Sequence, residues 1–565
     1  MGMNVVVIGG VACGPKAAAR LRRLDPKAQI TIVEQGEFIS YAGCGLPYYV
    51  GGEVKDINGL LATPAGAVRN AGFFKKVKDI AVLTRTRAEA IDRSSKTVRL
   101  RDLASGAERR LAYDKLVIAT GARPIRPPIE GLGLKGVYHL TRIEEALALR
   151  ETVSRRKGGK ALIIGAGLIG LESAEAFRSA GWDVQMVEMM EAPLPGLLDF
   201  EFARMVELAL LENLVTIACH QRAERIEGDE SGHCKRVITG GGAYEADLVL
   251  VATGFRPNAD LAREAGLAVG PCGGIAVDEA MRTSDPNILA GGDCVECRHV
   301  VTGKPVFAPM GSTANKHGRV IGDNLAGGHS AFPGVLGTTV VKVFNLNVGR
   351  TGLSEAQAAE EGFETVCGLA PGHDKAHYFP GAALVAVKVV AEKRTGKVLG
   401  VQAAGRGEAA RRIDVGATAI AMGATVAQLA NLDLGYAPPY AQAMDAIITA
   451  ANVAENKIRG VARSVGPREV KRRIEAGEDF ILLDVRTPAE FESGHIEAKQ
   501  TMNLPLGELR EKAQSVLPKD KDIVSLCKVS HRGYEAQRIL AGMGYEKASY
   551  MDGGLFTWPY PEDIA

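Results

Sequence analysis

The sequence lacks a strong net charge of either sign. Lys and Arg number 68 and Asp and Glu 66, which leaves a formal net charge of +2. Binding to nucleic acid or to an anionic membrane surface depends on an excess of basic residues. The composition therefore favours neither partner, and any site for an anion must be local.

The sequence also lacks the marks of a secreted or membrane protein. Its nine cysteines are odd in number and widely scattered, unlike a disulfide framework. The one long uncharged stretch, residues 415–432, contains polar residues and predicts a packed helix rather than a membrane span. The N-terminal MGMNVVVIGGVACG has no basic region and predicts a buried strand, not a signal peptide. We expect a cytoplasmic protein.

The length and composition indicate a large α/β protein. A chain of 565 residues exceeds a single core and predicts roughly three to five domains. A hydrophobic content of 46% and 67 glycines are typical of globular α/β chains.

A first dinucleotide-binding turn opens the chain. An apolar run at 4–8 is followed by GGVACG, a helical segment at 15–24 and a strand at 29–34 that ends at Glu34. Strand, glycine turn, helix, strand and acid is the order of a Rossmann unit. Gly9, Gly10 and Gly14 allow the tight turn, although the middle glycine position holds Val11.

A second and complete turn lies in residues 160–188. Gly165, Gly167 and Gly170 keep the G-x-G-x-x-G spacing, and Glu188 follows. A carboxylate accepts hydrogen bonds from ribose hydroxyls and repels a 2′-phosphate, and no Arg or Lys comes directly after it. This turn therefore predicts a preference for NADH over NADPH.

Three further turns fit a dinucleotide held across a sheet edge. Thr120 and Gly121 follow one strand and Gly254 another, where the backbone is expected to cross between domains. Asp293 follows a short strand and a Gly-Gly pair, which suits it to hold a polar cofactor group. A plain strand-end turn is the alternative.

With these turns and the segment SYAGCGLPYY, the chain resembles the flavoprotein disulfide reductases. The resemblance extends over roughly residues 3–455. The resemblance implies FAD on the first turn, NADH on the second and a C-terminal interface domain of a homodimer. Cys44 stands without a nearby second cysteine, as in coenzyme A disulfide reductases and NADH oxidases. In the coenzyme A branch, two interface tyrosines reach the thiol, and they correspond to Tyr436 and Tyr378 here. Aromatic packing at a dimer interface is the alternative role for both.

The first helix offers a site for coenzyme A. Lys16, Arg20 and Arg23 recur at helical spacing and form one basic stripe, while Ala17, Leu21 and Leu24 form the apolar one. A solvated charged face is the plain alternative. The family resemblance implies that this stripe, together with Ser40 and Lys78, contacts the coenzyme.

The last hundred residues resemble a rhodanese domain. D-V-R, G-H-I, a C-x-x-x-x-R loop and D-G-G stand in order after a linker expected at 453–466. Cys527 before a helix N-terminus would be stabilised as a thiolate or persulfide, with Arg532 adding positive charge. Cys13, Cys294 and Cys297 are expected to be packing residues. No second CxxC completes a metal site, so no metal is predicted.

Together these motifs predict an α/β chain with five segments. They are an FAD-binding domain at 1–120 and 255–330, an NAD(H)-binding domain at 121–254, an α+β dimerisation domain at 331–455 and an α/β rhodanese domain at 466–565. The expected activity is NADH-dependent, FAD-dependent reduction of coenzyme A disulfide, coenzyme A persulfide or polysulfide through a mixed disulfide on Cys44. An NADH oxidase working through a cysteine sulfenic acid, or a redox-sensing sulfur-relay protein, are the alternatives.

Overall fold

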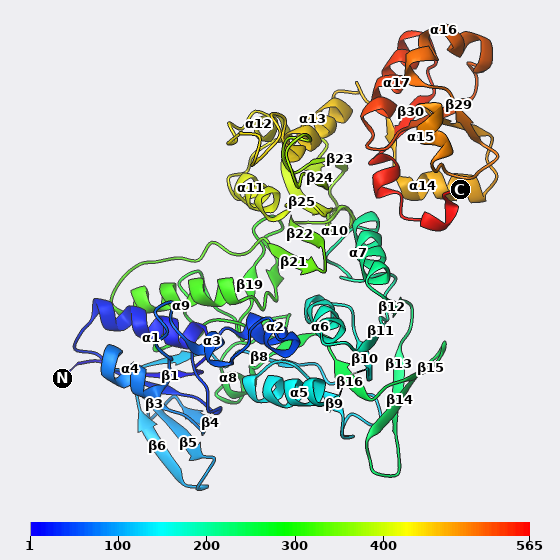
Figure 1. Ribbon diagram of the computed structural model, residues 1–565. Coiled ribbons are helices and arrows are strands. Elements are labelled where there is room, and N and C mark those ends of the chain that lie inside the picture. The colour runs from blue at the N-terminus through cyan, green and yellow to red at the C-terminus, as the bar shows by residue number, and fades with distance from the viewer. Residues whose placement is uncertain (1, 157) are drawn as a thin grey trace. The chain divides into compact units, whose positions relative to one another are not determined.

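The computed structural model describes residues 2–156 and 158–565 (Figure 1). The chain forms two compact units, one of Met1–Met190 with Leu214–Val335 and one of Glu191–Asn213 with Leu336–Ala565. Within the described residues, no helix has the length and apolar character that crossing a lipid bilayer requires.

The first unit opens with a parallel sheet in the order β18-β7-β1-β2-β3. Its strands are β1 (Asn4–Ile8), β2 (Gln29–Val33), β3 (Ala81–Leu83), β7 (Lys115–Ile118) and β18 (Ile288–Ala290). Val5, Val6 and Val7 are fully buried, as a strand covered on both faces requires. Helices α1 (Cys13–Leu24) and α9 (Gly311–Leu325) pack closely, because Gly318 and Gly322 leave no side chain between them.

The same unit contains a second parallel sheet, in the order β12-β11-β10-β16-β9. The strands are β9 (Val137–Tyr138), β10 (Lys160–Ile164), β11 (Asp183–Val187), β12 (Val215–Ala218) and β16 (Leu248–Val251). Helices α5 (Ile143–Arg155) and α6 (Leu168–Ser179) belong to this half. The two predicted Rossmann units are thereby confirmed.

Short elements complete the first unit. One three-stranded antiparallel sheet consists of β4 (Thr86–Asp92), β5 (Thr97–Asp102) and β6 (Glu108–Ala112), and another of β13 (Ala223–Gly228), β14 (Cys234–Thr239) and β15 (Gly242–Glu245). Two-stranded antiparallel sheets pair β8 (Ala122–Pro124) with β17 (Phe255–Pro257) and β19 (Cys297–Arg298) with β20 (Pro305–Val306). The remaining helices are η1 (Gly43–Gly45), α2 (Leu46–Gly51), α3 (Asn58–Leu61), α4 (Ala71–Lys78) and α8 (Asp260–Glu264).

The second unit begins with an antiparallel sheet in the order β21-β22-β25-β24-β23. Its strands are β21 (Thr339–Val343), β22 (Leu346–Gly352), β23 (Thr365–His373), β24 (Leu384–Glu392) and β25 (Val398–Gly405). Its helices are α7 (Phe200–Glu212), α10 (Glu355–Glu360), α11 (Ala410–Ala421), α12 (Val426–Ala430) and α13 (Ala446–Ile458). This mixture is the expected α+β domain.

The C-terminal part of the second unit is a parallel sheet in the order β26-β30-β29-β27-β28. Its strands are β26 (Ser464–Val465), β27 (Phe480–Asp484), β28 (Thr501–Asn503), β29 (Asp522–Leu526) and β30 (Ala548–Met551). Its helices are α14 (Pro467–Glu475), α15 (Pro488–Glu492), α16 (Leu506–Val516), α17 (His531–Gly542), η2 (Gly554–Thr557) and η3 (Pro561–Asp563).

Three sequence predictions need correction. Residues 415–432 do not form one helix, because the chain turns at Gly423, whose φ is +68°, between α11 and α12. The expected linker at 453–466 is shorter, since α13 continues to Ile458 and β26 begins at Ser464. Leu24 does not join the apolar stripe of α1, because its side chain is exposed.

Candidate functional site

The acids that follow the two glycine turns are held in the same way. The Glu34 carboxylate accepts hydrogen bonds from the N–H of Gly10 at 2.8 Å and of Gly36 at 2.7 Å. In the second half, the Glu188 carboxylate accepts from the N–H groups of Ala166 at 2.7 Å and Met190 at 2.9 Å. Each acid therefore connects the glycine turn of its own Rossmann unit to the end of the second strand of that unit.

The glycines of both turns are required by close backbone approach. A Cβ on Gly14 would stand 2.0 Å from the Gly9 carbonyl oxygen, and one on Gly170 would stand 2.1 Å from that of Gly165. Gly9 and Gly165 have φ values of +112° and +103°, which side chains disfavour. Gly167 has open space around it, so a ligand can approach its backbone. The N-terminus of α6, at the second turn, is thus open to a pyrophosphate.

The two predicted crossing points lie side by side. Thr120 Oγ1 donates to the Asn258 carbonyl oxygen at 2.7 Å, and β8 pairs with β17 directly after the two turns. Gly121 and Gly254 have φ values of +69° and +97°. These glycines allow the chain to turn sharply from one Rossmann half to the other.

Asp293 fits a polar cofactor group. Its Oδ1 is buried and has no hydrogen-bond partner among the described residues. Burial raises the pKa of this carboxyl to about 6. A buried oxygen of this kind normally has a partner, so a ligand hydroxyl or N–H would satisfy it. Together with the first glycine turn and Glu34, this residue fits the flavin dinucleotide that the sequence predicts.

Cys44 stands in the short η1 helix and is exposed. Its Sγ lies 3.8 Å from the point that a Cβ on Gly311 would occupy, and Gly311 is the first residue of the fifteen-residue helix α9. The positive end of a helix dipole stabilises a thiolate. Partial burial of the sulfur acts in the opposite direction and raises the pKa of Cys44, as do the charges of Glu172 and Asp293. All nine cysteines, each of which the structure describes, are free thiols.

Glu172 and Tyr48 are site residues that the sequence analysis missed. The Tyr48 hydroxyl donates to Glu172 Oε1 at 3.3 Å. Glu172 follows Gly170 by two residues in α6, and Tyr48 follows Cys44 by four in α2. The available signal was an acid two residues after the last glycine of the second turn, but its partner comes from a segment more than a hundred residues away.

The basic stripe of α1 is divided in two. Arg20 Nε pairs with Asp323 of α9 at 2.5 Å, so its charge is already matched. Arg23 instead lies near Lys78, where burial and the charge of Arg23 lower the pKa of Lys78. Among the described residues, Lys16, Arg23 and Lys78 form no ion pair with a carboxylate. The structure therefore brings Lys78 to the stripe and leaves positive charge unmatched at its end.

Ser40 is held by its backbone to the first glycine turn. Its N–H donates to the Gly10 carbonyl oxygen at 2.7 Å. Its φ of +51° lies in the left-handed region, which is uncommon for serine. This conformation fixes the start of the segment that carries Cys44.

Tyr378 and Tyr436 belong to the second unit and are both exposed, at 67% and 54%. Tyr436 lines a cavity of about 440 Å³ between the 430–436 and 441–445 segments. Tyr440 and Met444 are also exposed there. Exposed large apolar side chains gathered in this way are typical of an interface.

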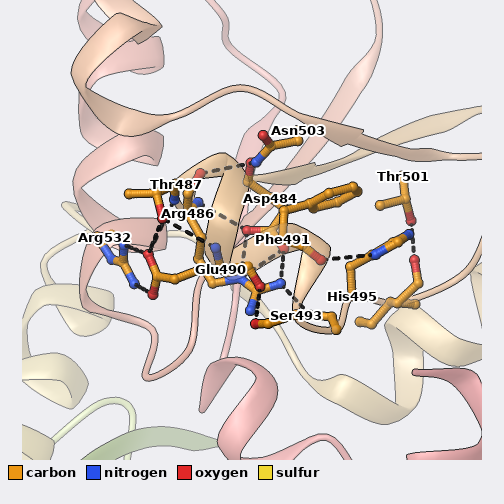
Figure 2. Close-up of polar contacts among 12 residues, drawn as sticks. Asp484, Arg486, Thr487, Glu490, Phe491, Ser493, His495, Thr501, Asn503 and Arg532 are labelled. Atoms are coloured by element: carbon orange, nitrogen blue, oxygen red, sulfur yellow. Dashed lines mark hydrogen bonds and ion pairs between the residues drawn. The ribbon is translucent and has the colours of Figure 1, made fainter. Parts of the chain in front are cut away.

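The rhodanese loop brings Cys527 within hydrogen-bonding reach of Arg532. Cys527 follows β29, has no exposed surface and precedes α17, which begins at His531. The Arg532 guanidinium donates to both Glu490 oxygens at 2.7 Å (Figure 2), and its pKa is raised by that carboxylate and by Cys527. Thr487 also contacts Glu490 through its N–H and hydroxyl.

Ser530 occupies a strained position in this loop. Its φ is +69°, where glycine is the usual residue, and its hydroxyl donates to the Met551 carbonyl oxygen at 3.3 Å. A buried ion pair between Asp484 and Arg486 at 2.6 Å lies at the end of β27, next to the end of β29, and Asn503 donates to the backbone carbonyl oxygens of both residues (Figure 2).

The buried cysteines of the first unit lie in unreactive surroundings. The Cys294 thiol donates to the carbonyl oxygens of Ile118 and Gly291. Cys297 lies 3.8 Å from His317 Nε2, but burial raises the pKa of Cys297 to about 12 and lowers that of His317 to about 4. Burial also raises the pKa of Cys13. In the described part of the chain, no group of His, Cys, Asp and Glu residues could hold a metal ion.

Comparison with known proteins gives three family matches. The model for "Pyridine nucleotide-disulphide oxidoreductase" matches residues 3–314, the model for its dimerisation domain matches 338–447, and the rhodanese-like domain matches 466–559.

Among individual proteins, the chain is 38% identical over 450 residues to the NAD(P)H sulfur oxidoreductase (CoA-dependent) of Pyrococcus furiosus, covering 80% of this chain and 98% of that protein. It is 34% identical over 457 residues to an NADH oxidase of Methanocaldococcus jannaschii, covering 81% and 99%. The solved structure of a NAD-dependent persulfide reductase from A. fulgidus is 48% identical, with a TM-score of 0.94 over 98% of this chain and 100% of that one.

Proposed function

Because this chain belongs to the pyridine nucleotide-disulphide oxidoreductases, we propose that it is an FAD-dependent, NADH-dependent reductase of coenzyme A disulfide and coenzyme A persulfide. The observation that carries the proposal is Cys44, an exposed free thiol at the N-terminus of α9. A thiol without a neighbouring cysteine can take a small thiol as its disulfide partner. The coenzyme A dependence named for the Pyrococcus protein supports this choice.

The flavin, when bound, supplies a two-electron carrier between a reduced nicotinamide and a disulfide. Gly9, Gly10, Gly14 and Glu34 would hold it on the first turn, with Thr120, Gly121 and Asp293 at the sheet edge. The turn of Gly165, Gly167 and Gly170, with Glu188 and Gly254, would hold NADH.

The sulfur step is carried by Cys44. Its thiolate attacks the sulfur that is bonded to coenzyme A, the S–S bond breaks, and the outer sulfur leaves as hydrosulfide. The product is a mixed disulfide between Cys44 and coenzyme A. Two electrons from NADH and one proton then return the Cys44 thiolate and release coenzyme A thiol.

Unmatched positive charge on α1 and at Lys78 would hold the coenzyme phosphates. Lys16, Arg23 and Lys78 are the side chains available for this role, with Arg20 held back by Asp323. Ser40 would contact the coenzyme from the start of the Cys44 segment. A lysine ammonium binds phosphate as a point charge, and an arginine guanidinium can bind it through two parallel N–H groups.

The dimerisation match supports a homodimer. Tyr378 and Tyr436 would then act as proton donors to the leaving thiolate in the site of a second copy. Their exposure in the single chain supports this role.

The rhodanese domain would carry sulfur to the reductase. Cys527 would hold a persulfide, and Arg532 and the N-terminus of α17 would stabilise its negative charge. Attack by the coenzyme A thiolate on the outer sulfur returns the Cys527 thiolate and gives coenzyme A persulfide, the substrate of Cys44.

A comparison of two electron acceptors tests the proposal. We expect NADH oxidation to be much faster with coenzyme A persulfide than with oxygen alone, and Cys44→Ser to abolish the persulfide reaction. Oxygen consumption that accounts for all NADH oxidised would instead support an oxidase that works through a sulfenic acid. The oxidase name of the Methanocaldococcus relative keeps that second candidate in the test.

A further inference from the structure

Glu172 connects the nicotinamide half of the first unit to the Cys44 segment. It lies in α6, which starts at the second glycine turn, and its Oε1 accepts a hydrogen bond of 3.3 Å from Tyr48. Tyr48 stands in α2, directly after the η1 turn of Cys44. One side-chain contact thus joins the two halves beside the reactive sulfur.

The packing of α2 holds this contact in place. A Cβ on Gly51 would stand 2.9 Å from Ala176 Cα, so α2 and α6 touch through their backbones. On the side of α5, Arg150 donates to the Tyr49 carbonyl oxygen and lies 4.7 Å from the centre of its ring. Tyr48 therefore has little freedom to leave Glu172.

The titratable groups that act on Glu172 are an acid, Glu175, and a tyrosine, Tyr48. Burial raises the pKa of this carboxyl to about 7, Glu175 of the same helix adds to the rise, and the Tyr48 hydrogen bond lowers it. Burial first, and then the charge of Glu172 and its hydrogen bond, raise the pKa of Tyr48 to about 12. Among the described residues, no Lys or Arg forms an ion pair with Glu172.

We propose that Glu172, positioned by Tyr48, sets the reactivity of Cys44 through its charge. An ionised carboxylate beside the sulfur keeps the thiol protonated, and a protonated carboxyl allows the thiolate to form. Because the charge of Glu172 acts on the Cys44 thiol, the two titrations are coupled. This inference rests on the proposed role of Cys44, but it concerns the thiol itself and not the identity of the substrate.

The sign of the effect follows from the order of the two titrations. Above about pH 7 Glu172 is ionised, and its repulsion raises the pKa of the Cys44 thiol. Removing that charge with Glu172→Gln therefore increases the thiolate fraction above pH 7. Below about pH 6 Glu172 is protonated in the wild type, so the two proteins become alike.

The test is the rate of alkylation of Cys44 by iodoacetamide between pH 5.5 and 9, in the full-length, flavin-bound protein. Mass spectrometry of the Cys44 peptide separates this thiol from the other eight. We expect Glu172→Gln to react about threefold faster at pH 8, because loss of the Glu172 charge lowers the pKa of the Cys44 thiol. The ratio to wild type should approach one at pH 5.5.

Two further variants separate this effect from a change in folding. Tyr48→Phe removes the hydrogen bond that stabilises the ionised carboxylate, so the pH at which the wild-type curve bends should move upward. Glu151→Gln in α5 removes a carboxylate that pairs with Arg155, and it should leave the curve unchanged. Equal alkylation of wild type and Glu172→Gln at every pH, or a ratio that does not vary with pH, would overturn the inference. Neither result would bear on the coenzyme A proposal.

Discussion

Arg532 and Glu490 are joined by two hydrogen bonds of 2.7 Å, one from each terminal guanidinium nitrogen. The pairing lowers the pKa of Glu490 to about 2, so it persists throughout the physiological range. Because Arg532 also faces Cys527, its pairing with Glu490 fixes the position of the guanidinium relative to the sulfur.

Arg532→Lys keeps the positive charge but loses the planar fork that binds Glu490. We expect sulfur transfer from a persulfide donor to fall about tenfold, because the cation is no longer held at Cys527. Sulfurtransferase activity measures this effect, and NADH-dependent reduction of coenzyme A disulfide should stay unchanged. Glu535→Gln, which alters an exposed partner of His531 on the same helix, is the matched control. Equal transfer rates in Arg532→Lys and wild type would contradict the assignment.

Arg23→Ala and Lys78→Ala should each raise the KM for coenzyme A substrates about fivefold, because a phosphate contact of this kind contributes roughly 1 kcal/mol. The increase should shrink at high salt, and more for the exposed Arg23 than for the half-buried Lys78. Arg22→Ala serves as the control, because Arg22 lies on the same helix and is held by the Asp79 and Pro26 carbonyl oxygens. If the KM values of Arg23→Ala and Lys78→Ala do not differ from that of Arg22→Ala, the proposed phosphate site on α1 is wrong.

Met189→Arg should change the nucleotide preference. Met189 follows Glu188 and is exposed, so a guanidinium there could reach a 2′-phosphate. We expect the ratio of kcat/KM for NADPH to that for NADH to rise at least about tenfold, as one added charge contact allows. Steady-state kinetics with both nucleotides measure the ratio. A wild-type protein that already prefers NADPH would refute the role given to Glu188.

Lys388→Met should destabilise the second unit strongly. The buried Lys388 ammonium lies 3.0 Å from Asp199, 2.7 Å from Glu201 and 2.6 Å from Glu355. Its removal leaves buried carboxylates unpaired, which costs about 3 kcal/mol or more of the free energy of unfolding. Lys393→Met breaks only the exposed pair with Glu364 and should cost less than about 1 kcal/mol. Denaturant unfolding compares the two variants.

The cluster of Lys388 with Asp199, Glu201 and Glu355 also predicts that the stability of the fold depends on pH. Burial alone would raise the pKa of Asp199, but Lys388 lowers it below its ordinary value. Asp199 therefore stabilises the fold above about pH 4, and this contribution is lost as the pH falls further. The difference in stability between wild type and Lys388→Met should narrow below pH 4. A difference that stays constant from pH 7 to pH 3 would contradict this account.

The sequence could predict the fold because its motifs are local. Gly165, Gly170 and Glu188 stand close together in the chain, and the spacing alone places them at one turn. The break at Gly423 was missed because a helical apolar pattern continues on both sides of the turn. Contacts between distant segments could not be predicted in the same way.

Two such contacts change the site. Asp323 neutralises Arg20 from 303 residues away, which a helical spacing rule cannot detect. Tyr48 and Glu172 meet only when α2 packs on α6. Both pairs come from tertiary packing, whereas the sequence reports periodicity within one segment.

Mass spectrometry of the intact, unreduced protein tests the central claim most directly. If Cys44 takes coenzyme A as its disulfide partner, the protein incubated with coenzyme A disulfide should carry one coenzyme A per chain on the Cys44 peptide, and NADH should remove it. A Cys44 peptide found only as the free thiol or as a sulfenic acid, with no coenzyme A adduct under these conditions, would contradict the account.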